Sequence, residues 1–316
     1  MIDRRHLLKL ASASALTAAL PDMLSAASAK RVLFVHGRAQ QALDPVRLQA
    51  AWVDALRRGI GAARRTMPTV EFAFPYYGDT LDRFTRDVAI PLTSEMTTRG
   101  GPLQDEFLVF QAEFAEAVRQ RSGVTDAQID AQYGSNPRTR GPLNWEWVQA
   151  ILRAIDINSG GVAATTLELF TRDVFLYCSR AGVRDQIDQI VASQLTEEPT
   201  VVVGHSLGSL VAYSVLRTDR RRLQVPVFVT VGSPLGVRSV RDHFRPLSRP
   251  PIDQWFNAYD PRDVVALYPL DGDNFPIQPA IQNHGAVNNH TDNRHGIDGY
   301  LDDVTVAGWI VNALAV

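Results

Sequence analysis

The chain has 316 residues, of which 45% are hydrophobic and 21% are charged, and its formal net charge is -2. This composition is typical of a soluble globular protein and fits one large domain or two ordinary ones. The near-neutral charge gives no electrostatic basis for a nucleic-acid partner, and the lone Cys178 excludes an internal disulfide and a cysteine-based zinc site.

Residues 1–29 resemble an export signal. Arg4 and Arg5 stand one residue before two leucines and a lysine, an arrangement similar to the twin-arginine signature. A mildly apolar stretch follows and ends in a small-x-small cleavage pattern at residues 27–29. The longest uncharged run is too short for a bilayer, which needs ~20 apolar residues, so no stable membrane span is expected. We expect export to the periplasm or exterior of a bacterial cell; the alternative is a cytoplasmic protein with an amphipathic N-terminal helix.

Five short runs rich in Val and Phe, each bounded by turn-forming residues, indicate buried strands of a parallel sheet. They cover residues 31–35, 70–74, 200–203, 225–231 and 255–258. Segments with helical spacing separate them, such as the apolar stripe at 183, 187, 190, 191 and 195. The alternation predicts a doubly wound, mostly parallel α/β sheet whose functional residues lie at the carboxyl ends of the strands.

The interval 78–160 shows no convincing strand. Its clearest feature is one apolar helix face, formed by Leu103, Phe107, Phe110, Phe114 and Val118. A second segment, 144–157, also has helical spacing, and breaks containing Gly or Pro divide the interval. We interpret it as a helical insertion or cap within a domain spanning 30–316. The alternative is ordinary helical decoration on one side of the sheet.

The most informative motif is G-x-S-x-G, with Gly204, Ser206 and Gly208, set between an apolar strand and a helix-compatible segment. A serine on a sharp strand-to-helix turn needs neighbours without a Cβ two residues before and two residues after it. Such a turn exposes the serine Oγ at a helix N-terminus, where backbone N–H groups favour a developing oxyanion. The motif therefore predicts that Ser206 is a nucleophile.

From about residue 30 to its end, the chain resembles a lipase- or esterase-type α/β-hydrolase. The resemblance rests on three pieces: Phe-Val-His-Gly at 34–37, Gly-His-Ser-Leu-Gly at 204–208, and Val-Gly-Ser-Pro at 231–234. It implies that the loop after the first strand supplies an oxyanion-hole N–H, here that of Arg38, with the N–H of Leu207 as the second. The 78–160 interval is the part that the resemblance covers least.

The family orders its catalytic triad as serine, acid and histidine. For the acid, Asp263 precedes two valines, as the family's acid precedes apolar residues, and is preferred; Asp260 is the runner-up, because Asp before Pro is common in turns. For the base, His295 lies just before the last apolar-periodic segment and fits best. His284 and His290 fit solvated loop positions, and the gaps between the three histidines do not match zinc-ligand spacing, so no metal is expected.

These roles imply a Ser-His-Asp hydrolase that forms an acyl-enzyme and needs no cofactor. A thioesterase, amidase or acyltransferase uses the same triad, and a non-catalytic binding module on the same fold stays an alternative. The apolar stripe at 103–118 and the segment 74–77, if they face the site, predict a pocket for a small-molecule ester with a neutral, short-to-medium acyl chain. If the stripe only packs on the sheet, the site is indifferent to chain length.

Overall fold

The computed structural model describes residues 29–98, 100–134, 140–159 and 163–314. The expected export signal lies outside the described residues, apart from Ala29. The described chain is an α/β protein with eleven α-helices and one sheet of six parallel strands in the order β2-β1-β3-β4-β5-β6. The strands are β1 (Arg31–Val35), β2 (Glu71–Ala73), β3 (Thr200–His205), β4 (Val227–Val231), β5 (Gln254–Ala258) and β6 (Gln282–His284).

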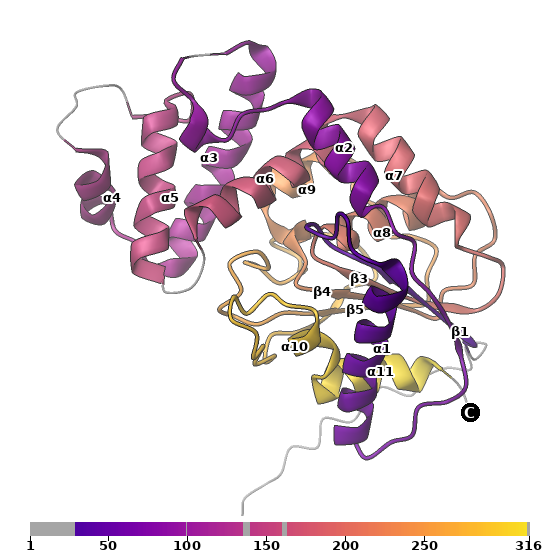
Figure 1. The fold of residues 1–316 in the computed structure, drawn as a ribbon. Helices are drawn as coiled ribbons and strands as arrows, with labels where there is room; N and C mark the ends of the chain where they lie inside the picture. The colour runs from indigo at the N-terminus through magenta and orange to yellow at the C-terminus, as the bar shows by residue number, and fades with distance from the viewer. Residues whose placement is uncertain (1–28, 99, 135–139, 160–162, 315–316) are drawn as a thin grey trace, which may run out of the picture.

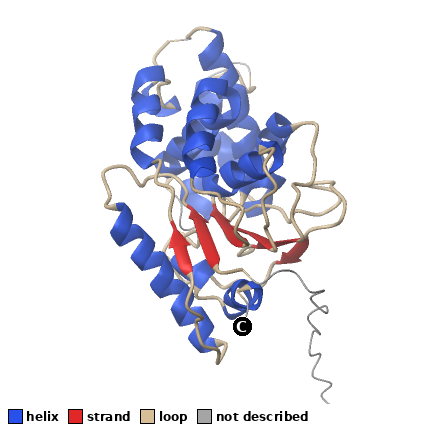
Figure 2. Cartoon of the chain, turned by 90° about the vertical axis from the view of Figure 1, so that its right-hand side faces the viewer, coloured by secondary structure: helices blue, strands red, loops and turns tan. Residues whose placement is uncertain are grey.

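Side chains alternate between the two faces of the sheet, and each face has its own apolar core. Leu33 and Val35 of β1 point into one core, whereas Val32 and Phe34 point into the other. The first core is covered by α2 (Gly78–Val88), α6 (Ala164–Ser179), α7 (Ala181–Ser193) and α8 (Leu207–Thr218). The second is covered by α1 (Pro45–Ala62), α10 (Asp298–Leu301) and α11 (Val304–Ala313). The sheet therefore lies between two helical layers, as Figure 2 shows.

The described part of the 78–160 interval contains helices and no strand. After α2 come a short 3₁₀ turn, η1 (Thr93–Glu95), and the helices α3 (Pro102–Ser122), α4 (Asp126–Tyr133) and α5 (Trp145–Ser159). In Figure 1 these three helices form a group beyond α6. Phe107 and Phe110 of α3 pack against Phe175 of α6, and Phe114 packs against Phe170. The apolar face of α3 thus joins the helical group to α6.

All five predicted strands are present in the structure, with bounds that differ by a few residues at most. One strand, β6, was not predicted. Its three residues, Gln-Asn-His, are polar and at least partly exposed, and the strand lies at the edge of the sheet, so no apolar run marks it. Its register is held instead by Asn283, whose side chain bonds Asn257 and the backbone of Leu270.

Two short 3₁₀ turns, η2 (Pro234–Gly236) and η3 (Asp242–Phe244), and the helix α9 (Arg238–Arg241) follow β4. α9 lies next to α3 and α6, η3 lies next to α6, and η2 lies next to α8. Across the described residues, none of the helices combines the length and the apolar composition that crossing a membrane requires.

Candidate active site

Ser206 occupies a sharp turn between β3 and α8. Its backbone has φ 55° and ψ -129°, a left-handed conformation that L-residues other than glycine rarely adopt. The conformation is fixed on one side by a hydrogen bond of 3.1 Å from the Ser206 N–H to the carbonyl of Val231. Backbone strain of this kind persists only where the surrounding structure enforces it, and it is concentrated at functional sites.

The two glycines of the motif are required by close backbone contacts. A Cβ at Gly204 would lie 2.7 Å from the Cα of Ser209, and a Cβ at Gly208 would lie 2.1 Å from the carbonyl oxygen of Val35. No side-chain rearrangement can relieve either contact, because the atoms that it would meet are backbone atoms. The turn that carries Ser206 is therefore possible only with glycine at both positions.

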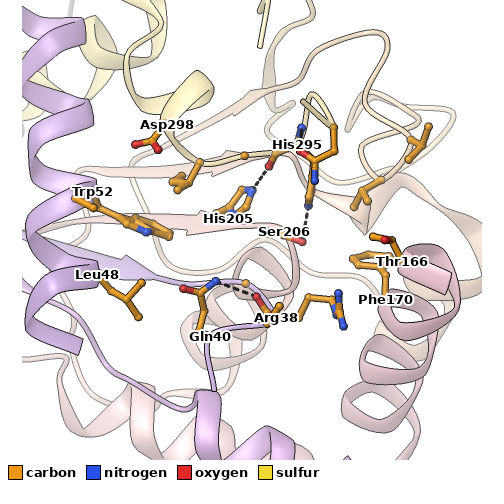
Figure 3. A pocket seen from close by; sticks show the side chains of 18 of the residues that line it. Arg38, Gln40, Leu48, Trp52, Thr166, Phe170, His205, Ser206, His295 and Asp298 are labelled. Atoms are coloured by element: carbon orange, nitrogen blue, oxygen red, sulfur yellow. Dashed lines mark hydrogen bonds between the residues drawn. The ribbon is translucent and has the colours of Figure 1, made fainter. Parts of the chain in front are cut away.

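Ser206, His295 and Asp263 form one hydrogen-bonded chain. The Nε2 atom of His295 lies 2.8 Å from the Ser206 Oγ, and its Nδ1 atom lies 2.7 Å from Asp263 Oδ2. A carboxylate can only accept, so Nδ1 carries the proton and Nε2 is free to accept from the serine hydroxyl. Figure 3 shows the imidazole of His295 pointing at Ser206. The structure brings together three side chains that are far apart in the sequence.

Asp263 is buried and held as a carboxylate. Burial by itself would raise the pKa of this carboxyl, but the charge of His295 and the hydrogen bonds from His295, Tyr300 and the Val265 N–H hold the pKa below its usual value. A carboxylate in this position orients the imidazole and stabilises its protonated form.

Asp260 makes different contacts. Its carboxylate, which is fully buried, accepts hydrogen bonds from the backbone N–H groups of Arg262 at 2.8 Å and Asn289 at 2.9 Å. The Asn289 side chain in turn donates to the carbonyl of Gly296, next to His295. Asp260 thus holds the turn and the loop that carries His295, but it does not contact the imidazole.

The two other C-terminal histidines lie away from Ser206. His290 is exposed and its Nε2 lies 2.9 Å from Asp302, and His284 lies 3.9 Å from Asp303. Neither lines the cavity that contains Ser206. The sequence preference for His295 among the three agrees with this arrangement.

The loop after β1 passes directly beside Ser206. A Cβ at Gly37 would lie 3.0 Å from the Cβ of Ser206. His36 fixes this loop: its Nδ1 donates to the Gly37 carbonyl at 2.7 Å, and its Nε2 accepts from the Tyr77 N–H at 3.1 Å. Burial lowers the pKa of His36 to about 4, which keeps the ring neutral and this pair of bonds intact at ordinary pH.

The backbone N–H groups of Leu207 and Arg38, the two predicted oxyanion-hole donors, make no backbone hydrogen bond to other described residues. Leu207 is the first residue of α8, so its N–H has no acceptor inside the helix. The N–H of Arg38 has no acceptor among the described residues. The Arg38 side chain is turned toward α6, where its Nε bonds Asp173 at 2.7 Å, and this ion pair fixes the loop against the helix.

Two residues of the site were not predicted from the sequence. His205 lies next to Ser206 in the motif, and its Nε2 is 2.7 Å from the backbone oxygen of His295. Tyr300 donates a hydrogen bond of 2.6 Å to Asp263 Oδ2. Adjacency to the serine is a signal that could have identified His205, whereas nothing in the sequence marks Tyr300, because its partner is 37 residues away.

A cavity of about 370 Å³ opens above Ser206 and His295. One wall is Leu48, Ala51 and Trp52 of α1, and the opposite wall is Thr166, Leu167 and Phe170 of α6 (Figure 3). The remainder includes apolar groups, the amide side chains of Gln40 and Asn293, and the charged side chains of Arg38 and Asp298. The cavity is therefore largely apolar, with Ser206 accessible between two helices.

The apolar stripe of α3 does not line this cavity, contrary to one of our two interpretations. Four of its five members are buried between helices, and Phe114 lies behind Phe170, with 5.4 Å between ring centroids. Residues 74–77 also lie outside the cavity lining; Phe74 packs on Trp52 and Tyr77 stacks on His36. The pocket wall comes from α6 instead.

The described residues contain no group of three or more His, Cys, Asp or Glu side chains that could hold a metal ion. Comparison of the chain with protein-family models, with curated proteins and with solved structures gave no match.

Proposed function

We propose that this chain is a serine hydrolase of the α/β-hydrolase type that cleaves a carboxylic ester through an acyl-enzyme. The observation that carries the proposal is the hydrogen-bonded chain from Ser206 through His295 to Asp263, with distances of 2.8 and 2.7 Å. The strained backbone of Ser206 and the loop packed beside it support the same interpretation.

In the first half of the reaction, Ser206 Oγ attacks the ester carbonyl carbon while His295 Nε2 takes the hydroxyl proton. Asp263 stabilises the resulting imidazolium. The negative charge on the former carbonyl oxygen is received by the N–H groups of Leu207 and Arg38, each such donor contributing about 3 kcal/mol. The C–O bond to the alcohol then breaks, and His295 gives the leaving oxygen the proton.

In the second half, water takes the place of the alcohol. His295 removes a proton from this water, the hydroxide attacks the acyl carbon, and the proton returns to Ser206 Oγ as the acid leaves. The scheme requires only side chains and backbone groups of this chain, in the arrangement described above.

The cavity lining supports a neutral substrate. Its two helical walls are mainly aliphatic and aromatic. Both charged side chains of the lining have partners: Arg38 is paired with Asp173, and Asp298 lies 3.4 Å from Arg58. A volume of about 370 Å³ suits a small acid or alcohol group better than a long chain. We therefore retain the short-to-medium acyl ester as the proposed substrate, with α6 in place of α3 as its apolar wall.

A thioesterase, amidase or acyltransferase would use the same residues, and no specific contact favours one of them. A binding module on the same scaffold would not need a strained serine bonded to an imidazole. The reactivity of Ser206 separates an enzyme from such a module, because fluorophosphonates react only with a serine that is activated as a nucleophile.

The experiment is labelling of the purified protein with a fluorophosphonate probe, alongside hydrolysis of p-nitrophenyl esters. Ser206→Ala is expected to abolish both while leaving the unfolding temperature nearly unchanged, because the Oγ has a hydrogen bond only with His295 among the described residues. Ser214→Ala is the matched control: it removes a hydroxyl of α8 that bonds Asp188, and labelling is expected to persist. Labelling of the Ser206→Ala variant at the wild-type rate would rule out the proposal.

A further inference from the structure

The hydroxyl of Tyr300 and the imidazole of His295 share one oxygen atom of Asp263. Tyr300 Oη lies 2.6 Å from Asp263 Oδ2, and His295 Nδ1 lies 2.7 Å from the same atom. The Asp260 N–H donates to the Tyr300 oxygen at 3.2 Å, so the single hydroxyl proton is left for Asp263. Asp263 Oδ2 therefore accepts two hydrogen bonds, and only one comes from the imidazole.

The hydroxyl is a permanent donor. Tyr300 is fully buried, and burial together with the negative charge of Asp263 raises its pKa well above the usual value for tyrosine. Its ring is fixed independently of the hydroxyl, because it packs closely against Gly232: a Cβ at Gly232 would lie 3.0 Å from the ring. Tyr300 is thus a rigid, uncharged group aimed at the carboxylate.

We propose that Tyr300 is a positioning residue that sets the pH at which His295 can accept the Ser206 proton. The inference rests on the proposed function. A hydrogen bond to a carboxylate draws negative charge toward its donor, so the tyrosine hydroxyl weakens the attraction between Asp263 and a protonated imidazole. His295 then stays neutral, and able to act as a base, at a lower pH than it would beside an Asp263 bonded to the imidazole alone.

The other titratable groups around His295 do not replace this effect. His205 on β3 is a buried neutral ring, with a pKa that burial lowers to about 3. Asp260 accepts from two backbone N–H groups and is also paired with Arg262 at 3.5 Å and with Arg294, the residue before His295, at 3.7 Å. Arg38, across the cavity, is paired with Asp173 on α6. Asp298, before Tyr300 on α10, is half exposed and lies 3.4 Å from Arg58.

The first test is Tyr300→Phe, which removes the hydroxyl and keeps the packed ring. The matched control is Tyr213→Phe. Like Tyr300, this buried tyrosine accepts from a backbone N–H, but its hydroxyl donates to the carbonyl of Ser248 and not to a carboxylate, and it lies in the core away from His295. Two pH midpoints are measured for each variant. The first is that of the His295 NMR signal, which is assigned by its loss in His295→Gln. The second is the midpoint of the acidic limb of kcat/KM.

In Tyr300→Phe we expect both midpoints to move up by about 0.5 to 1 pH unit, which lowers kcat/KM about 3- to 10-fold on the acidic limb. In Tyr213→Phe both should stay at the wild-type value. A loss of thermal stability in Tyr300→Phe with unmoved midpoints would show that the hydroxyl serves the fold only, and would overturn the inference.

A second variant covers the case in which Tyr300→Phe does not fold. Difluorotyrosine at position 300 keeps the ring and the hydroxyl but is a stronger donor, so it should move both midpoints down. An unchanged or upward midpoint would contradict the inference. The NMR midpoint does not depend on turnover: midpoints that shift without any ester hydrolysis would count against the proposed function alone, whereas normal hydrolysis with fixed midpoints would count against the role of Tyr300 alone.

Discussion

The backbone carbonyl oxygen of His295 accepts a hydrogen bond from Nε2 of His205 at 2.7 Å. The residue before Ser206 thus holds the loop that carries the imidazole bonded to Ser206. The two rings also pack together, with centroids 4.8 Å apart. Burial lowers the pKa of His205 to about 3, so this bond is made by an uncharged ring.

This burial predicts that stability falls between pH 6.5 and 5. His205 and His36, with pKa values of about 3 and about 4, stay neutral in the folded protein, whereas both take up a proton in the unfolded chain below about pH 6.5. The unfolded state binds more protons in this window, so the free energy of unfolding should fall by roughly 2 kcal/mol for each histidine by pH 5. Urea unfolding at pH 7, 6 and 5 measures this loss.

Asp188 opposes that loss and provides the control. Burial raises its pKa to about 6 despite hydrogen bonds from Tyr177 and Ser214, so the folded state binds its proton first. Its contribution therefore grows as the pH falls from about 6 to about 4, by roughly 1 kcal/mol at pH 5. In Asp188→Asn the acid loss should be steeper than in the wild type; an equal or shallower loss would contradict these assignments.

Comparing Asp263→Asn with Asp260→Asn should show which of the two aspartates is the acid of the triad. The uncharged amide cannot stabilise a protonated imidazole, and its NH₂ group can donate to Nδ1 and so favour the wrong tautomer of His295. We therefore expect kcat to fall about 10⁴-fold with little loss of substrate binding. In Asp260→Asn the amide retains one acceptor oxygen for two backbone donors, so the variant should lose about 1 to 3 kcal/mol of stability and keep most of its turnover. Steady-state kinetics and urea unfolding on both variants measure the difference. If Asp260→Asn were the inactive one, the acid would be misassigned.

Gly208→Ala should destabilise the fold, and the cause should be backbone contacts rather than helix propensity. The added Cβ would meet the carbonyl oxygens of Val35 and His36 at 2.1 and 2.4 Å, so we expect a loss of more than about 3 kcal/mol. Gly308→Ala in α11 is the control, since a Cβ there meets nothing within 4 Å and should stabilise the helix by up to about 1 kcal/mol. Thermal unfolding of both variants measures this. A Gly208→Ala protein as stable as the wild type would mean that the turn is looser than described.

Phe170 should limit the acyl chain that the cavity accepts. In the wild type kcat/KM should rise about fourfold per added CH₂, which corresponds to roughly 0.8 kcal/mol, until the cavity is full. Phe170→Leu puts a smaller side chain in the α6 wall, which enlarges the cavity and should make the preferred p-nitrophenyl ester one or two carbons longer. Phe175→Leu changes the same helix outside the cavity and should leave the preference alone. An identical chain-length profile for all three proteins would show that Phe170 does not contact the acyl group.

The sequence by itself predicted the features that are local. Four of the six strands, β1, β3, β4 and β5, are buried along nearly their whole length and appear in the sequence as apolar runs, because a strand buried on both faces needs apolar side chains. The fifth predicted strand, β2, is only partly buried and was found through the longer run at 70–74. The turn at Ser206 was also predictable, because its G-x-S-x-G motif is local and the steric demand for Gly204 comes from Ser209. The contacts that require Gly208 come from Val35 and His36, which only the fold brings to the turn. Asp263 and His295 were predicted from the order of triad residues that the family resemblance implies, and the structure joins both to Ser206 in one hydrogen-bonded chain.

Only the tertiary structure decided which surfaces meet. The apolar face of α3 was visible in the sequence, but an amphipathic pattern shows that a face is buried and not what buries it. In the folded chain that face packs behind Phe170, so α6 rather than α3 lines the cavity. Tyr300 was not predicted for the same reason. Its hydrogen bond to Asp263 joins a helix to a loop, and the packing of the sheet brings these two segments together. No spacing along the chain indicates this contact.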